Sequence, residues 1–406
     1  MNKTQKTIIF LLSSSIRETK VENLNTDNIN WLDVFEEAEA HNVTPLIFPT
    51  LKALHQYATI DEELISKWKR ASLLCGINQI MHIKQMSKVF ENFREANIPI
   101  IALKGLVIRD LYPHPELRSM SDADILVHKG DIDKSEKVLV NLGYYKDSSI
   151  EIHSTFDHKK HLSIDLHWAL VNELHIKTVS HFDKTLWTNT RTVAMNGLPI
   201  LALSLEYELL HLILHMASHM IKSGFGLRQL CDVVLFIESK KDHIDWKIFF
   251  EKVKLYNIEN LTITIFIVCK ELFNMDLPKE QDIKYFNYNH HIEFLINEIF
   301  ASGVFGKRDY IRSNSTKIMQ ENYNNDENST NEINLMISFL FPSPKKLNVK
   351  YSYAKKYPFL IIFAWIHRIM YTLCFYGFSK FKQIGTLYTT AKIAKDRLKL
   401  LRWLQL

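Results

Sequence analysis

The spacing of apolar positions predicts an alternating strand–helix block set between two helical regions. Helical periodicity runs through residues 1–95 and is clearest over Glu62–Asn97, where Pro99 ends it. The segment that follows has short apolar runs of strand length, separated by turn residues. Helical spacing returns after Leu203. The expected fold class is therefore α+β, with a small mixed sheet and flanking helical N- and C-terminal regions.

Shifts in composition divide the 406 residues into five expected parts. A core at 96–200 follows a helical N-terminal region at 1–95 and precedes a helical domain at 201–312. Residues 313–334 are rich in Asn, Ser and Glu and poor in apolar groups, which predicts a flexible linker or surface loop. The last part, 335–406, is expected to form a basic helical C-terminal region.

The core is expected to interleave strands with helices. In chain order its elements are the strand Ile98–Leu103, the helix Leu106–Tyr112, the strand Ala123–His128, the helix Asp131–Leu142, the strands Ile150–Phe156 and His161–Trp168, and a hairpin over Arg191–Ala202. The hairpin turn is predicted at Asn196-Gly197, because this dipeptide favours tight turns between strands.

Composition indicates a globular protein of a reducing compartment. Hydrophobic residues make up 47% of the chain and charged residues 23%, and the net charge of +5 does not by itself indicate nucleic acid. The four cysteines are scattered without a Cys-x-x-Cys pair, which argues against a zinc ribbon and against a disulfide framework. The apolar run Ile8–Leu12 is short for a signal peptide, so an amphipathic first helix and a cytoplasmic location are expected.

Two carboxylates mark the strand at Ala123–His128. Asp122 and Asp124 would project from one face, because alternate side chains of a strand point the same way. Two like charges side by side are costly without a cation between them. Oxygen ligands of this kind suit Mg²⁺.

Two further features strengthen this hypothesis. Asp165 lies in an apolar strand and shares a face with His167, and a third carboxylate would complete a ligand set for two cations. A salt bridge to a nearby Arg or Lys remains the alternative for this buried charge. Lys104 and Gly105 stand between a strand and a helix, where a glycine lets a phosphate approach the backbone and a lysine supplies charge. An ordinary turn with a surface lysine explains the same two residues.

These parts resemble the DNA polymerase β-like nucleotidyltransferase superfamily, and more closely its bacterial branch usually called the uncharacterised nucleotidyltransferase family. The matching motifs are Leu103–Gly105, Tyr112–Pro113, Arg118, Asp122–Val127 and Asp165–Trp168. The resemblance spans most of the chain and is weakest over 313–334.

The resemblance implies transfer of a nucleoside monophosphate from an NTP to an acceptor hydroxyl on a small molecule or peptide, with release of pyrophosphate. Asp122 and Asp124 would hold two Mg²⁺ ions. Asp165 would bind the second ion and accept the proton of the acceptor hydroxyl. All three are thus expected to be catalytic residues and metal ligands.

The resemblance also implies how the phosphates are bound. Lys104 and Arg118 would neutralise phosphate charge, and the backbone at Gly105 would approach the phosphates. The superfamily's usual Gly-Ser pair is replaced here by Lys104-Gly105. Ser119 and Ser121 are offered as further phosphate ligands on position alone.

Histidines on one helix face are expected near the same cleft. His211, His215 and His219 follow at a spacing of four, which allows either a zinc site or a face that lines the active site. No His-Glu-x-x-His pattern accompanies them. The lining interpretation is favoured, and the residues expected to line the cleft are His167, His215, His219 and Arg228.

The C-terminal segment leaves several partners open. From Pro342 onward it carries thirteen Lys or Arg residues against one acid, Asp396. The apolar stretch Phe359–Phe378 is long enough to span a membrane, although a buried helix pair explains the pattern as well. Peripheral contact with anionic lipid, or contact with RNA, is compatible with the same composition.

Other functions stay open at this stage. A toxin that adds nucleotides to tRNA would use the same chemistry on another acceptor. An Asp-x-Asp glycosyltransferase would bind a nucleotide-sugar and would not need Asp165. A non-catalytic nucleotide-binding protein would keep the metal ligands without turnover. The sequence does not identify the acceptor, the base of the NTP or the oligomeric state.

Overall fold

The computed structural model describes residues 1–21, 24–54, 59–170, 185–222, 224–276, 289–304, 310–323, 331–347, 349–376 and 385–406. The chain forms two compact units. The first comprises Met1–Ser218, Gly226–Phe300 and Gln405–Leu406, and the second comprises His219–Phe225 and Ala301–Leu404.

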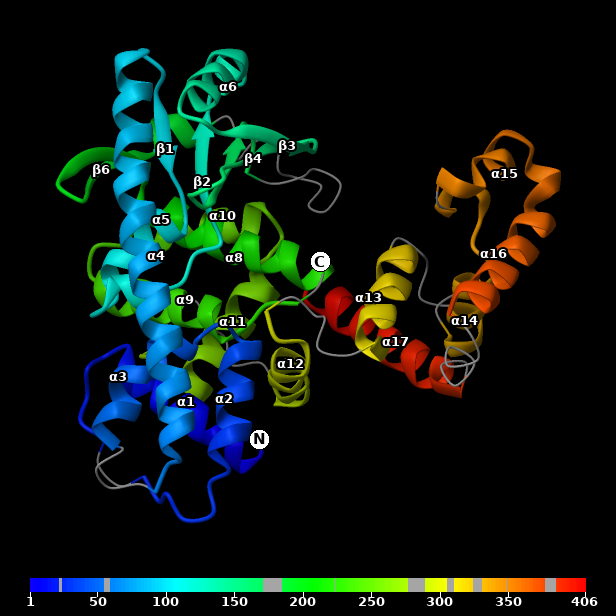
Figure 1. Ribbon diagram of the computed structural model, residues 1–406, viewed down its shortest axis with the longest axis horizontal. Coiled ribbons are helices and arrows are strands. Elements are labelled where there is room, and N and C mark those ends of the chain that lie inside the picture. The colour runs from blue at the N-terminus through cyan, green and yellow to red at the C-terminus, as the bar shows by residue number, and fades with distance from the viewer. Residues whose placement is uncertain are drawn as a thin grey trace. The chain divides into compact units, whose positions relative to one another are not determined.

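A seven-stranded mixed sheet lies in the first unit, with the order β3-β4-β5-β2-β1-β7-β6 (Figure 1). Its strands are β1 Ile100–Ala102, β2 Asp122–Val127, β3 Tyr145–Ser149, β4 His153–Asp157, β5 Ser163–His167, β6 Thr190–Met195 and β7 Leu198–Leu203. The β2–β5 and β1–β7 pairs are parallel and the other pairs antiparallel. This arrangement confirms the expected α+β class with a small mixed sheet and flanking helices.

Helices precede, separate and follow the strands along the chain, and helices also form the second unit. They are α1 Lys3–Ser15, α2 Trp31–Ala40, α3 Thr44–Leu54, α4 Glu62–Glu95, α5 Gly105–Ile108, α6 Ile132–Asn141, α8 Leu205–Lys222, α9 Leu227–Lys240, α10 Trp246–Leu255, α11 Glu259–Phe273, α12 Asn289–Ser302, α13 Tyr310–Asn322, α14 Glu332–Leu340, α15 Ser352–Lys356, α16 Ile361–Tyr376 and α17 Leu387–Trp403. The expected helix Leu106–Tyr112 is shorter, because α5 gives way to a 3-10 turn at Arg109–Leu111.

Strand prediction succeeded where apolar residues alternate and failed where they do not. The hairpin of β6 and β7 turns at Asn196 and Gly197, whose φ angles of 52° and 80° match the tight turn expected from that dipeptide. Strand β3 was missed because all five of its residues are exposed and give no apolar pattern. Strand β4 begins three residues later than the expected Ile150.

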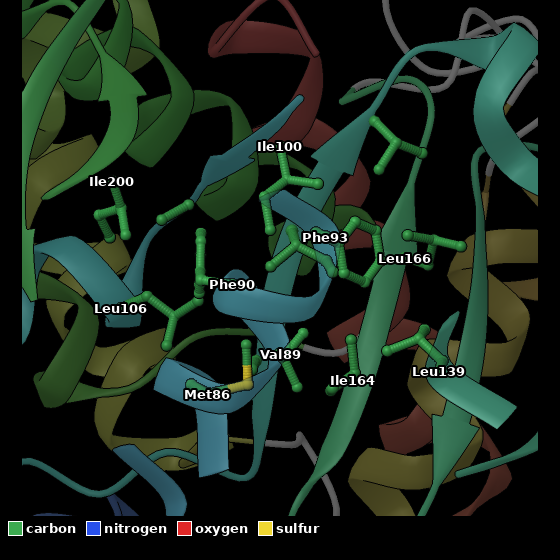
Figure 2. Close-up of a cluster of buried hydrophobic side chains, with 14 of the residues drawn as sticks. Met86, Val89, Phe90, Phe93, Ile100, Leu106, Leu139, Ile164, Leu166 and Ile200 are labelled. Carbon is green, nitrogen blue, oxygen red and sulfur yellow. The ribbon is translucent and has the colours of Figure 1, made fainter. Parts of the chain in front are cut away.

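The hydrophobic core joins one face of the sheet to α4 (Figure 2). Ala123, Ile125 and Val127 of β2 enter this core, as do Ile164 and Leu166 of β5. Their partners include Met86, Val89, Phe90 and Phe93 of α4 and Leu139 of α6. Because strand side chains alternate, the residues between them face the other side of the sheet, and these include the predicted carboxylates.

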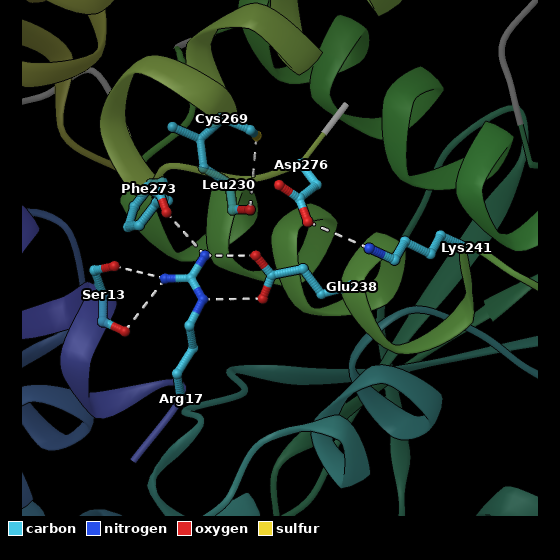
Figure 3. A network of polar contacts seen from close by, with 8 residues as sticks. All are labelled: Ser13, Arg17, Leu230, Glu238, Lys241, Cys269, Phe273 and Asp276. Atoms are coloured by element: carbon cyan, nitrogen blue, oxygen red, sulfur yellow. Dashed lines mark hydrogen bonds and ion pairs between the residues drawn. The ribbon is translucent and has the colours of Figure 1, made fainter. Parts of the chain in front are cut away.

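A polar network ties the first helix to the helices that follow the sheet (Figure 3). The Arg17 guanidinium donates to both carboxylate oxygens of Glu238 on α9, at 3.0 and 2.6 Å, and to the Phe273 carbonyl at the end of α11. It also bonds to the Ser13 hydroxyl of α1 at 2.5 Å. This fork-shaped contact fixes α1, α9 and α11 to one another.

In the second unit α13 and α14 both pack on α17. Residues 310–322 form α13, so the expected loop over 313–334 is wrong in its first part, and 324–330 lie outside the described residues. The helix buries polar side chains: Thr316 accepts a hydrogen bond of 2.7 Å from the Arg397 guanidinium of α17. A polar segment can therefore form a packed helix, because Arg397 supplies a hydrogen-bond partner for the buried Thr316 hydroxyl.

Within the described residues, no helix combines the length and apolarity needed to cross a membrane. The apolar stretch Phe359–Phe378 continues from a 3-10 turn at Pro358–Leu360 into α16, and its last two residues lie outside the described part of the chain. Contact of the basic segment with lipid or RNA stays a prediction.

Candidate active site

The parallel pairing of β2 with β5 places Asp124 directly beside Asp165. Asp122 lies on the same face of β2, where its strand partner is Ser163. The hydroxyl of Thr155, on β4, donates a 2.7 Å hydrogen bond to Asp165 Oδ1 and orients that carboxylate. The structure thus brings the three predicted carboxylates to one side of adjacent strands, while their catalytic role stays a prediction.

Lys104 reaches these carboxylates from the end of β1. Its Nζ atom lies 2.7 Å from Asp124 Oδ1, in a pair that is nearly buried. The backbone at Lys104 has φ 46° and ψ −116°, a conformation that residues other than glycine rarely adopt. The Leu103 N–H donates to the Asp124 carbonyl and the Ile108 N–H donates to the Lys104 carbonyl, which hold this turn in place. Backbone strain at a candidate site is consistent with function.

The glycine after Lys104 is required by packing. A Cβ atom at Gly105 would lie 2.5 Å from Arg118 Nη1 and 2.6 Å from Met120 Sδ. Any side chain there would push Arg118 or Met120 out of position. Close approach of a phosphate to Gly105 stays a prediction beside this structural role.

The surroundings shift the pKa values of the two β2 carboxylates in opposite directions. Burial alone would raise the pKa of Asp124, but the Lys104 ammonium and the His167 hydrogen bond outweigh it and hold that pKa well below its ordinary value. Burial raises the pKa of Asp122, and the neighbouring charge of Asp124 raises it further. Asp124 is therefore the firmly ionised member of the pair, and a bound cation would favour ionisation of both.

Imidazole groups surround the carboxylates. His167 Nε2 lies 2.9 Å from Asp124 Oδ1, and His153 Nε2 lies 3.6 Å from Asp165 Oδ2. Burial, together with the neighbouring His167, lowers the pKa of His153 to about 4. Burial also lowers the pKa of His211 well below its ordinary value, with Lys104 acting in the same direction. His153 and His211 are therefore neutral near pH 7.

Asp124, Asp165 and His167 form a group that can hold a metal ion. Each offers one ligand atom, and these atoms lie within 4.8 Å of one another. His167, expected only to line the cleft, thus joins two of the predicted ligands. Asp122 is outside this tight group, and its part in metal binding stays a prediction.

Arg118 was expected to contact phosphate, but the structure directs its guanidinium elsewhere. Arg118 is 5% exposed, and its Nε and Nη2 atoms donate to the two oxygens of Asp232 on α9, at 3.1 and 2.6 Å. The Tyr112 hydroxyl donates to the same carboxylate at 2.7 Å. Direct phosphate contact by Arg118 would require this buried pair to open.

The remaining expected residues lie around this centre. The Ser119 hydroxyl donates to the Asn42 carbonyl at 3.3 Å, and the exposed Ser121 hydroxyl donates to Asp122 Oδ1 at 3.2 Å. Arg228 Nη1 donates to the Ser119 carbonyl, and its charge acts on Asp122. Phosphate binding by either serine stays a prediction.

The three histidines expected on one helix face are divided between the two units. The His211 and His215 rings are 6.4 Å apart on α8, and His215 helps to lower the pKa of Asp124. His219 belongs to the second unit. Within the described residues, these three histidines do not form a metal-holding group.

Two groups near the site, one partly buried and one fully buried, were not expected from the sequence. His153 lies in a short strand whose neighbours gave no functional signal. Glu208 of α8 is fully buried, and burial, only partly offset by the Arg191 charge, leaves its pKa at about 8. A glutamate inside the apolar periodicity of Leu205–Lys222 was the available signal for Glu208.

Comparison with known proteins agrees with this arrangement. Residues 27–274, more than half of the chain, match the model of a family described as uncharacterised nucleotidyltransferase. The chain therefore belongs to this nucleotidyltransferase family and is a transferase. Its place in the wider DNA polymerase β-like superfamily and a bacterial origin stay predictions.

One solved structure and the curated proteins complete the comparison. The solution structure of the antibiotic-resistance factor ANT(2'')-Ia is similar over 44% of this chain and 95% of its own, with 13% identity and a TM-score of 0.35. A likeness that weak carries no argument about this chain. No curated protein matches the sequence.

Proposed function

We propose that the protein transfers a nucleoside monophosphate from an NTP to an acceptor hydroxyl on a small molecule or peptide. The observation that carries this proposal is the register of β2 and β5, which puts Asp124 beside Asp165 with Lys104 2.7 Å from Asp124. Carboxylates beside a lysine ammonium suit a reaction whose substrate carries negative charge and a divalent ion.

Lys104 would act on the triphosphate, and Asp165 would act on the acceptor hydroxyl. Lys104 would leave Asp124 Oδ1 for the triphosphate, whose charge exceeds that of a single carboxylate. Asp165, oriented by Thr155, would accept the proton of the acceptor hydroxyl. The acceptor oxygen then bonds to the α-phosphorus, the bond from that phosphorus to the bridging oxygen breaks, and pyrophosphate leaves with the electron pair.

Divalent ions held by Asp122, Asp124 and Asp165 would neutralise the phosphates and lower the pKa of the acceptor hydroxyl. The carboxylates fit this demand because they share one face and because Asp124 is ionised. Gly105, Ser119 and Ser121 would contact phosphate, and Arg228 would line the same cleft. Arg118 would act through position, since its charge is paired with Asp232.

The competing functions differ in what they require of Asp165. A glycosyltransferase that uses an Asp-x-Asp pair does not need a third carboxylate, whereas this chain pairs Asp165 with Asp124 and gives it a hydrogen-bond donor. A tRNA acceptor and a non-catalytic nucleotide-binding role remain outcomes that the experiment separates.

The test is to incubate the purified full chain with each of the four α-³²P-labelled NTPs, a divalent ion and a cell extract. Labelled small molecules, peptides and RNA are then separated, and pyrophosphate is measured. Label should move to one class of acceptor and should be lost in Asp124→Asn and Asp165→Asn. Asp147→Asn, an exposed carboxylate of β3, is the matched control and should keep the activity.

Three results would overturn the proposal. Label that transfers equally well in Asp124→Asn and Asp165→Asn would remove the carboxylates from the reaction. Label that moves only when a nucleotide-sugar labelled in its sugar replaces the NTPs would indicate the glycosyltransferase. NTP binding without pyrophosphate release under all these conditions would indicate a nucleotide-binding protein without turnover.

A further inference from the structure

The candidate site contains a nitrogen donor as well as carboxylates. His167 lies two residues beyond Asp165 on β5 and therefore on the same face of the strand. Its Nε2 atom is 2.9 Å from Asp124 Oδ1 and lies in the group whose ligand atoms are all within 4.8 Å. Ligands of one divalent ion lie about 2.0–2.2 Å from it. Small side-chain movements would therefore let all three atoms reach a single ion.

The His167 ring is held in place with Nε2 directed at Asp124. His167 is 5% exposed, so its orientation is set by the strand and by neighbouring side chains and not by solvent. Its Nδ1 atom is buried and has no hydrogen-bond partner among the described residues. Nε2 is the ring atom held against the carboxylates, where it donates to Asp124, and a bound ion would take the place of that proton.

Imidazole is a poor ligand for magnesium and a good one for later first-row metals. Mg²⁺ prefers oxygen and keeps much of its water, whereas cobalt and zinc bind mixed oxygen and nitrogen sets. An ion that contacts Asp124, Asp165 and His167 would meet two oxygens and one nitrogen. Lys104 and His167 both contact the same oxygen of Asp124, so an ion there would take over a position already built for positive charge.

We propose that His167 is a direct metal ligand and that, together with Asp124 and Asp165, it makes this site select a divalent ion of the cobalt–zinc class over Mg²⁺. The inference rests on the proposed function for its site but concerns only which ion the protein side chains choose. It replaces the carboxylate-only ligand set expected from the sequence with a mixed set at this position.

The test uses Co²⁺ as the probe, on the full chain without a purification tag. Visible absorption of bound Co²⁺ gives its affinity, and competition with Mg²⁺ and with Zn²⁺ gives the order of preference. The wild type should bind Co²⁺ at least about 100-fold more tightly than Mg²⁺. In His167→Gln this preference should fall by about tenfold or more, through weaker Co²⁺ binding with little change for Mg²⁺.

Two further measurements separate direct ligation from a positioning role. His153→Gln is the matched control, because His153 lies near Asp165 but outside the tight group, and it should keep the preference. Proton NMR of the Co²⁺-loaded wild type should reveal a strongly shifted, exchangeable imidazole N–H, as expected when a histidine binds the paramagnetic ion. This second readout does not depend on whether His167→Gln folds.

The outcomes also distinguish this inference from the proposed function. A preference unchanged in His167→Gln, an equal loss in His153→Gln, or the absence of a shifted imidazole N–H in the wild type would overturn the assignment. NMP transfer with Mg²⁺ in a protein without these signs would leave the transferase proposal standing. Co²⁺ bound through His167 in a protein that transfers no nucleotide would leave the metal assignment standing alone.

Discussion

Arg118 and Asp232, 114 residues apart in the chain, form a two-point ion pair in which each side chain is 6% exposed. Because both charges are buried, the loss of one partner leaves the other uncompensated. Asp232→Ala should therefore lower the free energy of unfolding by about 3–5 kcal/mol, measured by urea denaturation.

The matched control for that variant is Asp276→Ala. Asp276 also pairs with a cation, Lys241, but its side chain is 81% exposed. An exposed pair contributes about 0–1 kcal/mol, so this variant should unfold nearly as the wild type does. Equal effects of the two substitutions would mean that burial does not make the Arg118 pair important.

Gly105→Ala should destabilise the fold and weaken NTP binding. The added Cβ would lie 2.5 Å from Arg118 Nη1, and that guanidinium cannot move without disturbing its bonds to Asp232. Overpacking of this kind costs about 1–3 kcal/mol. Gly130→Ala is the control, because no atom lies within 4 Å of its added Cβ. Thermal melts and NTP titrations of both variants would check this, and a neutral Gly105→Ala would contradict it.

Much of the site could be predicted because strands have a period of two. The pattern Asp122-Ala-Asp124 fixes two carboxylates on one face whatever else the chain does, and the apolar neighbours of Asp165 put it opposite the core. The sequence could not provide the register that sets Asp124 beside Asp165, since it depends on which strands become neighbours. The resemblance to a known family supplied that step as an expectation.

The sequence does not reveal partners that come from far along the chain. The family resemblance implies phosphate contact for Arg118, which stays a prediction, whereas the structure pairs its guanidinium with Asp232 on α9. The polar composition of α13 favours a loop, but Arg397 of α17 donates to its buried Thr316 and the segment is helical. The residues next to a position in the sequence do not indicate which distant side chain will pair with it.

Thr155→Val should slow nucleotidyl transfer without weakening NTP binding. The Thr155 hydroxyl donates to Asp165 Oδ1 at 2.7 Å, and its loss would let the proposed proton acceptor rotate. A drop of about tenfold or more in kcat with KM for the NTP nearly unchanged is expected. Thr192→Val, at an exposed position of β6, is the matched control. A change confined to KM would assign Thr155 to substrate binding instead.

Glu208 should make stability depend on pH. Burial raises its pKa in the folded protein from 4.5 to about 8. Below about pH 4.5 the carboxyl is protonated in both the folded and the unfolded chain. Between pH 4.5 and 8 only the unfolded chain releases the proton. The free energy of unfolding therefore falls as pH rises through this range, and the fall levels off above about pH 8.

Glu208→Gln removes this titration and so isolates it. The free energy of unfolding of the wild type, relative to the variant, should fall between pH 5 and 8.5 by on the order of 4 kcal/mol. Urea denaturation across this range would measure the difference, with Glu251→Gln at an exposed position of α10 as the control. Parallel curves for wild type and Glu208→Gln would mean that Glu208 is ionised in the folded protein. In that case the charge of Arg191 would offset the cost of burying the Glu208 carboxylate.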